Sequence, residues 1–384
     1  FTDPDHPERE MRDEGVLRAF RQVLRESAPD VVHFHNFHGL TFAMAEETRR
    51  AGIPSVYTPH NYHMIDPDLY LFNSDLSLWN GTDLLANSEA VARNPEKGAA
   101  YRLRIETTKR LLNDWVDVVL AVSSRQRELL VDYGAAPEKV AVVHQASRST
   151  DLLWEDPALS KVGTRPLGKP LRFGFIGGVM PHKGVHMLVG AAQLFQPGEA
   201  EFHVYGFVST GYLEELQALD RRGMVVFHGA YGEADLPAIA AGIDVAVVPS
   251  VWEDCAPLVL LELMALRLPI IGARIGGIPD FVAEGVNGYL YRHDSLAELV
   301  ACLRRCAADP GMVAKMRERL ASPHSFNRYM GHLQEIYRLL KERKPLLLPE
   351  LELRVRLGAK DRPAPLPAVV WEGSQFVGHS LALV

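Results

Sequence analysis

Short runs of apolar residues alternate with longer amphipathic segments along most of the chain. Nine runs have the length of strands and are rich in Val, Ile, Phe and Tyr: residues 31–35, 55–58, 116–123, 140–144, 171–178, 202–206, 224–229, 243–249 and 268–272. Continuously apolar strands of this kind are typical of parallel sheets that are covered on both faces. The alternation therefore predicts an α/β fold with doubly wound parallel sheets.

The chain divides where this alternation stops. Residues 148–170 are polar and proline-containing without a regular period, which predicts a linker between an N-terminal domain over 1–147 and a C-terminal domain over 171–324. Apolar residues at helical spacing then predict a long closing helix over 325–343, followed by a tail over 344–384. That apolar stripe consists of Phe326, Tyr329, Leu333, Ile336, Tyr337 and Leu340.

Composition narrows the class of protein. A chain of 384 residues exceeds what one core usually supports, which agrees with two domains. The net charge of −7 argues against a general binder of nucleic acid. No apolar run approaches the roughly 18 residues that span a bilayer, and no signal peptide is evident. The chain has three cysteines, Cys255, Cys302 and Cys306. They are too few for a disulfide framework and lack the paired spacing of zinc ligands, so we expect a reducing, cytoplasmic location.

Two acids stand eight residues apart around the apolar run PLVLLELMAL, namely Asp254 and Glu262. Each has an ordinary explanation, Glu262 as an exposed position on an amphipathic helix and Asp254 as a helix cap. Their surroundings favour a ligand site instead, because they follow the buried strand 243–249. Open α/β sheets bind ligands beyond the carboxyl ends of their strands.

The helix that follows this strand is expected to begin at Pro257, whose missing N–H is no loss in the first helical position. The free amides of the next three residues, Leu258, Val259 and Leu260, would then point out of the helix start. A helix start favours anions, phosphate above all.

A second motif, GFIGGVMPHKG over residues 174–184, predicts a strand, a glycine turn and a helix start. Gly177 and Gly178 would let the backbone approach a ligand, and Lys183 could reach a phosphate as a point charge. Alone this is a weak signal, since a tight turn with a solvated lysine explains it equally well. Together with PSVWEDCAPLVLLE and GARIGGIPDFV, it favours a phosphate site.

These motifs together resemble the retaining glycosyltransferases of family four, the glycosyl transferase group 1, which have the GT-B fold. The matching stretches are FIGG…HKG, VYG, HG, VPS, LLELMALRLPII and GGIPDFVAEGVNGYLY, and Asp254 and Glu262 stand at the spacing of the family's E-x7-E signature. The resemblance implies two Rossmann-like domains with a cleft between them. It also implies transfer of a sugar from a nucleotide-diphosphate sugar to an acceptor hydroxyl, with retention and with no metal or cofactor.

The resemblance assigns roles to the C-terminal motifs. Glu262 would bind the ribose hydroxyls, because a carboxylate accepts two hydrogen bonds from a vicinal diol. Asp254 would lie near the hydroxyls of the donor sugar and serve catalysis. The remaining donor-binding residues would be Gly177, Gly178, Lys183, Gly206, Leu258 and Val259.

Two positions depart from the family pattern. Asp254 replaces the usual glutamate, which shortens that side chain by one methylene. Gly178 stands where many members have an arginine. A charge-assisted hydrogen bond is worth about 1.5–3 kcal/mol, so donor binding would weaken about ten- to a hundredfold unless another group compensates.

Five histidines lie within a short span of the N-terminal domain, namely His33, His35, His38, His60 and His63. A zinc site and buried structural histidines are both possible interpretations. The family resemblance implies a third, in which His60 faces the donor sugar as a catalytic residue. His35, Asn36, His38 and Asn61 would then lie on the acceptor side.

Other functions remain open at this stage. One alternative is a related GT-B phosphorylase or epimerase, although no lysine motif for a pyridoxal cofactor is present. Another is a non-catalytic sugar-nucleotide module, motivated by Gly178, although Lys183, Asp254, Glu262 and His60 are all retained. The expected partners are a nucleotide sugar and a glycan or small-molecule acceptor, as in polysaccharide biosynthesis. Peripheral contact with a membrane is compatible with the sequence, whereas nucleic acid is not an expected partner.

The two ends of the chain raise a further hypothesis. Residues 1–30 contain an amphipathic helix and no strand, so the N-terminal domain is expected to lack its first strands. Residues 366–384 instead suggest a strand, a glycine turn and one helical turn, which is how a transferase-like domain of this family opens. We favour a fragment of a tandem protein. The tail could also supply the missing edge, with Val369–Trp371 pairing beside strand 31–35.

Overall fold

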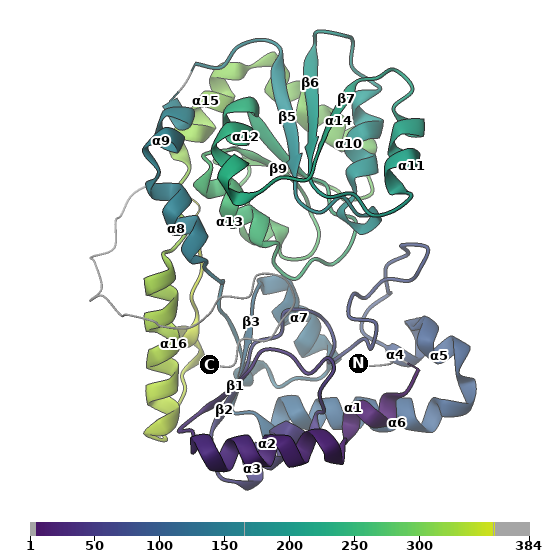
Figure 1. The fold of residues 1–384 in the computed structure, drawn as a ribbon, viewed down its shortest axis with the longest axis vertical. Helices are drawn as coiled ribbons and strands as arrows, with labels where there is room; N and C mark the ends of the chain where they lie inside the picture. Colours follow the sequence, from purple (N-terminus) through teal and green to yellow (C-terminus); the bar gives the residue numbers. More distant parts are fainter. Residues whose placement is uncertain (1–4, 165, 356, 358–384) are drawn as a thin grey trace. The chain divides into compact units, whose positions relative to one another are not determined.

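The computed structural model describes residues 5–164, 166–355 and 357. These residues form two compact units. Unit 1 contains residues 5–144 and Asn327–Arg354, and unit 2 contains Gln145–Phe326. Each unit is built around one parallel sheet, which confirms the predicted α/β architecture (Figure 1). None of the described helices combines the length and the apolar character needed to cross a membrane.

The sheet of unit 1 has the order β1-β2-β3-β4, and all of its pairs are parallel. The strands are β1 (Val32–Phe34), β2 (Ser55–Tyr57), β3 (Val118–Ala121) and β4 (Val140–Val142). β2, β3 and β4 are buried along their whole length, which explains their unbroken apolar sequence. Within the described residues the strand order does not reverse, and β1 has β2 as its ladder partner.

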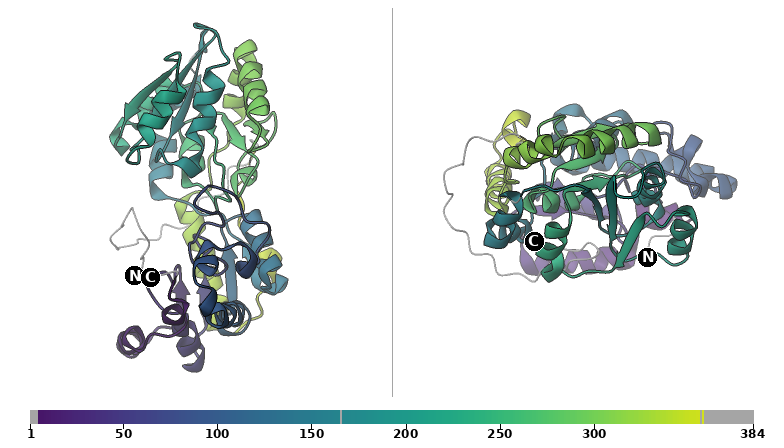
Figure 2. Two further views of the ribbon diagram at one scale, coloured as in Figure 1. Left: turned by 90° about the vertical axis from the view of Figure 1, so that its right-hand side faces the viewer. Right: turned by 90° about the horizontal axis from the view of Figure 1, so that it is seen from above.

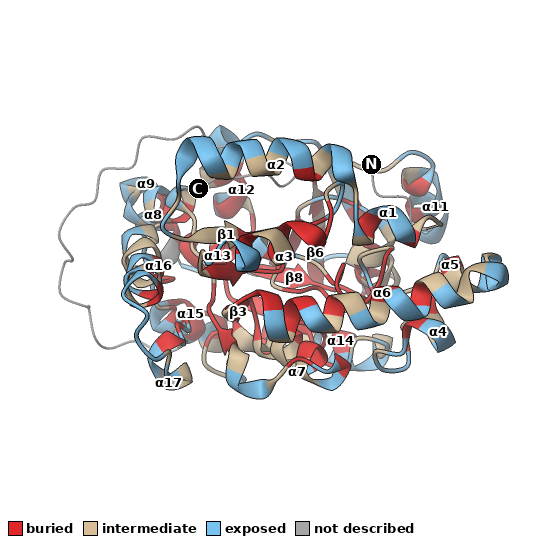
Figure 3. Cartoon of the chain, turned by 90° about the horizontal axis from the view of Figure 1, so that it is seen from below, coloured by how far each residue is buried: buried red, intermediate tan, exposed pale blue. Residues whose placement is uncertain are grey.

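Helices surround this sheet. They are α1 (Pro7–Met11), α2 (Glu14–Ser27), α3 (Ala43–Arg50), α4 (Leu84–Asn87), α5 (Glu89–Arg93), α6 (Gly98–Arg110), α7 (Ser124–Tyr133), α16 (Phe326–Lys341) and α17 (Leu348–Leu351). Short polar side chains cap two of these helices, since the side chain of Asp13 accepts from Val16 N and that of Ser123 from Gln126 N. α2 is largely exposed, whereas β3 is buried (Figure 3).

The expected closing helix is α16, which buries the predicted stripe at Tyr329, Leu333, Ile336 and Leu340. After it, the chain pairs with the sheet of unit 1 once more, through an isolated parallel bridge between Leu353 and Val143. This bridge extends the sheet beside β4 and not beside β1. The pairing predicted for Val369–Trp371 lies outside the described residues.

The sheet of unit 2 has the order β10-β9-β8-β5-β6-β7, again all parallel. Its strands are β5 (Leu171–Ile176), β6 (Ala200–Tyr205), β7 (Val225–Gly229), β8 (Val245–Val248), β9 (Ile270–Ala273) and β10 (Gly288–Tyr291). The order reverses between β5 and β8, so this sheet is doubly wound. The crevice at such a reversal is the usual ligand site of an open α/β sheet.

Helices cover both faces of this second sheet (Figures 1 and 2). The helices of unit 2 are α8 (Arg148–Glu155), α9 (Pro157–Thr164), α10 (Val185–Ala192), α11 (Tyr212–Leu219), α12 (Leu236–Gly242), α13 (Leu258–Ala265), α14 (Leu296–Ala308) and α15 (Pro310–Arg319). The segment predicted as a linker, 148–170, is therefore largely helical. α8 packs against α13, and the Arg267 guanidinium lies 3.2 Å from the Trp154 ring centroid. Such tertiary contacts stabilise short helices that have little periodicity of their own.

A buried ion network joins three separate segments of unit 1. The carboxylate of Glu10 accepts a hydrogen bond from Arg104 Nε at 2.7 Å and lies 3.0 Å from His63 Nε2. All three side chains are at most 1% exposed. Burial alone would raise the pKa of Glu10, but Arg104 and His63 outweigh it and lower that pKa to about 2. The network fixes the end of α1 against α6 and the loop after β2.

Replacing Glu10 with glutamine should destabilise the protein by about 3–5 kcal/mol at pH 7, because the charge of Arg104 would stay buried without its partner. The folded pKa of about 2 lies below the ordinary value of 4.5. The stability that Glu10 contributes is therefore complete above pH 4.5 and is lost as the pH falls towards 2. Urea unfolding of both proteins between pH 7 and pH 3 measures this difference. A gap between them that stays constant over that range would contradict the assignment.

Candidate active site

A pocket of about 130 Å³ opens at the strand reversal of unit 2. Its lining comes from the carboxyl ends of β5 and β8, the turns after them and the start of α13. The lining residues are Phe175, Ile176, Gly177, Gly178, Lys183, Val248, Ser250, Asp254, Pro257, Leu258 and Val259. Six residues predicted for donor binding or catalysis thus share one pocket, namely Gly177, Gly178, Lys183, Asp254, Leu258 and Val259.

Glycines allow the turns around this pocket to touch. Gly184 has a φ of +71°, and a Cβ there would lie 1.8 Å from the carbonyl oxygen of Pro249. Gly206 has a φ of +154°, and a Cβ there would lie 1.7 Å from the carbonyl oxygen of Gly177. Gly206 therefore supports the first glycine turn and is not among the pocket's lining residues. A Cβ on Gly178, by contrast, would have no neighbour within 4 Å, so the pocket is open above it.

Lys183 and Asp254 form an ion pair inside the pocket, with 2.6 Å between Nζ and Oδ2. Asp254 is only 6% exposed. Burial raises the pKa of its carboxyl, and Lys183 opposes that shift. The Lys183 ammonium also lies 5.3 Å from the centroid of the Trp252 ring. The ammonium is thus held at the pocket by a buried counter-charge and an aromatic ring.

The backbone of Asp254 is fixed by the turn after β9. Gly277 N donates to the Asp254 carbonyl oxygen at 2.7 Å, and a Cβ on Gly276 would lie 2.2 Å from that oxygen. The motif GARIGGIPDFV therefore brings a third strand end to the site. The turns after β5, β8 and β9 meet at one residue, Asp254: Lys183 contacts its carboxylate, and Gly277 contacts its backbone carbonyl.

Helix α13 begins at Leu258, one residue later than predicted, and Pro257 is its N-cap. The amide of Leu260, which we expected to be free, donates to the carbonyl oxygen of Pro257 at 3.0 Å. Leu258 and Val259 line the pocket, and their amides belong to the first turn, which has no intrahelical acceptor for them. The helix start thus presents two amides, and not three, near Lys183.

Glu262 lies on α13 one turn beyond Leu258 and on the same face, because residues four apart are neighbours on a helix. It does not line the pocket and is half-buried. Burial and the nearby Glu233 raise its pKa. Burial and the charge of Glu262 raise the pKa of Tyr231 to about 12. Among the described residues, no donor hydrogen-bonds the Glu262 carboxylate, which leaves it able to bind a ligand.

In unit 1, three histidines stack at the carboxyl ends of β1 and β2. The rings of His33 and His35 lie 4.1 Å apart, and those of His35 and His60 lie 5.2 Å apart. His35 Nδ1 and His60 Nε2 are 2.9 Å apart and share a hydrogen bond. Burial lowers the pKa of His35 to about 4. The side chain of His60 is exposed on one side. Desolvation by the surrounding protein and the neighbouring His35 still lower the pKa of His60. These rings are therefore neutral at pH 7.

The other predicted acceptor-side residues lie in the same two loops. Asn36 accepts a hydrogen bond from the amide of His38 through its side chain, and Asn61 does the same for His63. Both asparagines thus shape their turns. His38 is exposed and meets the buried ring of His63 edge-on at 5.6 Å. Across the described part of the chain, no group of three or more His, Cys, Asp or Glu side chains could hold a metal ion.

Several site residues were not predicted from the sequence. Ser250 and Pro257 line the pocket, and Tyr231 and Glu233 lie near Glu262. Ser250 directly follows a buried strand, and Tyr231 follows the glycine that ends β7, so strand ends were the available signal. Thr58, which contacts His33, also stands at a predicted strand end, whereas Tyr337, the other partner of His33, was predicted only as part of an apolar stripe.

Comparisons with known proteins agree with this geometry. The family model "Glycosyl transferase 4-like domain" matches residues 4–146, and the model "Glycosyl transferases group 1" matches residues 170–309. The chain is 27% identical to an alpha-maltose-1-phosphate synthase of Mycolicibacterium smegmatis, over 82% of this chain and 80% of that protein. It is also 27% identical to a D-inositol 3-phosphate glycosyltransferase of Salinispora arenicola, over 84% and 71%.

Solved structures show the same fold. The Anabaena protein HepE in complex with UDP superposes with a TM-score of 0.63 at 19% identity, covering 84% of this chain and 81% of that one. The sucrose-phosphate synthase of Thermosynechococcus elongatus gives 0.63 at 17% identity, covering 85% and 77%. With the paired parallel sheets and the site at the reversal of the second sheet, these matches show that the chain belongs to the group 1 glycosyl transferases and has the GT-B fold.

Proposed function

We propose that the protein transfers a sugar from a nucleotide-diphosphate sugar to the hydroxyl of a glycan or small-molecule acceptor, with retention of configuration. The observation that carries this proposal is the pairing of the Lys183 ammonium with Asp254 at the start of α13. A cation and two helix-start amides at a strand reversal suit a diphosphate. The UDP complex of HepE supports the same class of donor.

The diphosphate would lie over Gly177 and Gly178, against the amides of Leu258 and Val259. Negative charge grows on it as the bond to the sugar breaks, and preorganised donors stabilise that charge without reorganising. Lys183 would add its full positive charge. We therefore propose that leaving-group stabilisation needs no metal ion and no cofactor.

Asp254 has two roles in this proposal. One carboxylate oxygen holds Lys183 at 2.6 Å, so the side chain orients the cation that the diphosphate needs. The donor sugar would approach the same carboxylate, as the family resemblance implies. An aspartate in place of glutamate suits the first role, because the shorter side chain keeps the charge beside the helix start.

Glu262 would accept hydrogen bonds from the two ribose hydroxyls. Its carboxylate is half-buried and lacks a hydrogen-bond donor among the described residues, so a diol would satisfy it. The position on α13, one turn beyond the proposed diphosphate contacts, agrees with the order of groups in a nucleotide. Burial and the charge of Glu262 raise the pKa of the nearby Tyr231, and this tyrosine would border the nucleoside.

His60 would contact the transferred sugar, and His35, Asn36, His38 and Asn61 would line the acceptor side. The assignment rests on the family resemblance and on the grouping of these residues at two strand ends of unit 1. A neutral His60 can donate or accept one hydrogen bond without placing a charge beside the departing diphosphate. Retention also rests on the resemblance. The cytoplasmic location expected from the three cysteines stays a prediction.

A panel of nucleoside diphosphates tests the proposed function first. Thermal shift with each diphosphate, followed by turnover of the matching nucleotide sugars, separates an enzyme from a binding module. Stabilisation by a nucleoside diphosphate together with release of that diphosphate from its sugar supports the proposal. Stabilisation without turnover for any sugar and acceptor would instead favour the non-catalytic module.

Glu262→Ala should weaken nucleoside-diphosphate binding about tenfold or more, because the ribose loses two hydrogen bonds to a charged acceptor. Glu215→Ala, at an exposed position on α11 in the same unit, is the matched control and should bind normally. Calorimetric titration measures both. Equal affinity of the two variants would remove Glu262 from the ribose site.

His60→Ala should lower kcat by about tenfold or more while nucleoside-diphosphate affinity changes little, because the proposed partner of His60 is the reacting sugar. His332→Ala removes a histidine of the same unit whose Nε2 lies 2.7 Å from the carbonyl oxygen of Leu351, and serves as the control. Steady-state kinetics with the donor found above gives both parameters. If His60→Ala turned over like the control, the histidine would be structural.

A further inference from the structure

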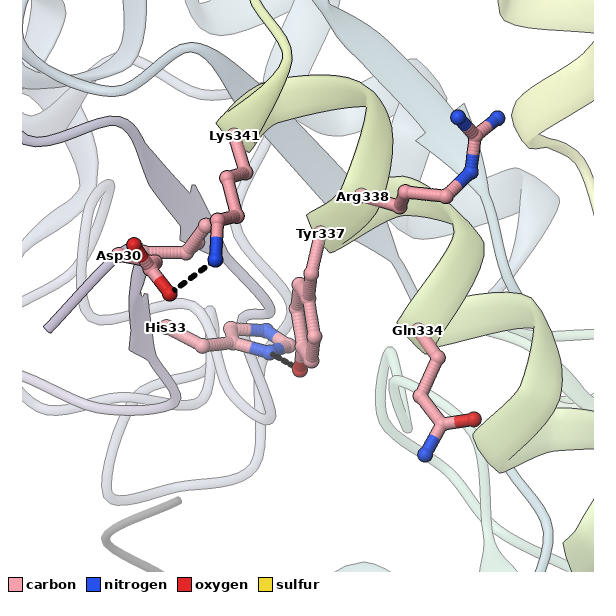
Figure 4. A pocket seen from close by; sticks show the side chains of 7 residues that line it. Asp30, His33, Gln334, Tyr337, Arg338 and Lys341 are labelled. Carbon is pink, nitrogen blue, oxygen red and sulfur yellow. Dashed lines mark hydrogen bonds and ion pairs between the residues drawn. The ribbon is translucent and has the colours of Figure 1, made fainter.

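Helix α16 reaches the histidine stack of unit 1 through one side chain, Tyr337. Its hydroxyl lies 2.6 Å from His33 Nδ1, and the two rings meet edge-on with centroids 5.6 Å apart. Figure 4 shows the tyrosine ring facing His33 across this hydrogen bond. The contact joins residues 304 positions apart in sequence, so folding brings the last long helix to the first strand.

Both ring nitrogens of His33 have a partner. The second nitrogen, Nε2, lies 2.8 Å from Thr58 Oγ1. The amide of Thr58 in turn donates to the Phe34 carbonyl oxygen at 2.8 Å, which places this hydroxyl at the end of β2. A neutral imidazole has one donor and one acceptor nitrogen, so one of the two hydroxyls donates to the ring of His33 and the other accepts from it, and together they fix its orientation.

The fixed ring of His33 supports the rest of the stack. His35 lies against it at 4.1 Å, with an interplanar angle of 28°. His35 is hydrogen-bonded to His60 through Nδ1 and Nε2, with the two rings at 17° to each other. An unbroken series of contacts therefore runs from Tyr337 through His33 and His35 to His60.

The surroundings of Tyr337 make its hydroxyl important for the orientation of the histidine rings. A cavity of about 380 Å³ borders it, lined by Asp30, Val31, His33, Gln334, Tyr337, Arg338 and Lys341 (Figure 4). His33 and Tyr337 both line this cavity, so packing constrains their rings less on that side, and the hydrogen bond between them constrains them more. An ion pair between Lys341 and Asp30, 2.7 Å long, also links α16 to the segment just before β1. Both of its side chains are at least 60% exposed, so it contributes little.

We propose that Tyr337 and His33 are positioning residues, which hold His35 and His60 in the one arrangement that transfer requires. The inference rests on the proposed role of His60 and extends it to α16. The shared proton lies either on His60 Nε2, which leaves Nδ1 as an acceptor for the sugar, or on His35 Nδ1, which makes Nδ1 of His60 a donor. The stack selects one of these two states, and no proton leaves the pair.

Tyr337→Phe is the direct test, because it keeps the ring and removes only the hydroxyl. The matched control is Tyr133→Phe, which removes another tyrosine hydroxyl of unit 1, 2.7 Å from Thr108 Oγ1. Lys341→Ala is a second control, because it breaks the ion pair of α16 and leaves the stack intact. Thermal midpoints establish that all three variants are folded.

The first readout is independent of activity. Nitrogen-15 spectra of the histidine rings at pH 7, assigned by substituting His33, His35 and His60 one at a time, report the tautomer of each ring. In Tyr337→Phe we expect the signals of His35 and His60, besides that of His33, to shift or broaden. Neither control should change them. If only the His33 signal responded, the proposed coupling to His60 would be wrong.

The second readout is kinetic. Tyr337→Phe should lower kcat about three- to tenfold, the scale of one lost hydrogen bond, and leave nucleoside-diphosphate affinity at the level of both controls. An unchanged kcat beside altered His60 signals would overturn the positioning role. If the wild-type protein shows no transfer, the proposed function fails, and the ring spectra still decide whether Tyr337 sets the state of His60.

Discussion

The ion pair between Lys183 and Asp254 is the contact on which the candidate donor site depends. It joins the turn after β5 to the turn after β8, and Gly277 secures the same aspartate from the turn after β9. The pair is mostly shielded from water, and breaking such a pair costs more than forming it gains. A cation is thereby kept at a helix start in a chain whose net charge is −7.

The two units position their polar groups in different ways. In unit 2, glycines let three turns touch, and the backbone itself lines the pocket. In unit 1, contacts between side chains hold the polar groups in place. The buried pair of Glu10 and Arg104 fixes the loop after β2, and the histidine rings stack on one another. Under the proposed function, unit 2 would thus offer charge for a diphosphate, and unit 1 would offer neutral hydrogen-bonding groups.

Local patterns were enough to predict much of this structure. The nine predicted strands are present, and β2, β3, β4, β8 and β9 are apolar because they are buried along their whole length. The glycine turn and the acid pair pointed to the pocket. The strand β10, GYLY, was missed because it is short and edged by polar residues. The helices α8 and α9 were missed because tertiary packing, and not periodicity, stabilises them. Contacts between distant residues, such as Lys183 with Asp254 or Tyr337 with His33, leave no trace in local sequence.

Titration of the protein with a nucleoside diphosphate and with the matching nucleoside, in wild type and in Lys183→Met, tests the account most directly. Each protein is its own reference, so any loss of stability affects both ligands alike. We predict that wild type prefers the diphosphate and that Lys183→Met loses about ten- to a hundredfold of that preference, the scale of a charge-assisted hydrogen bond. An equal preference in both proteins would show that no diphosphate binds beside Lys183.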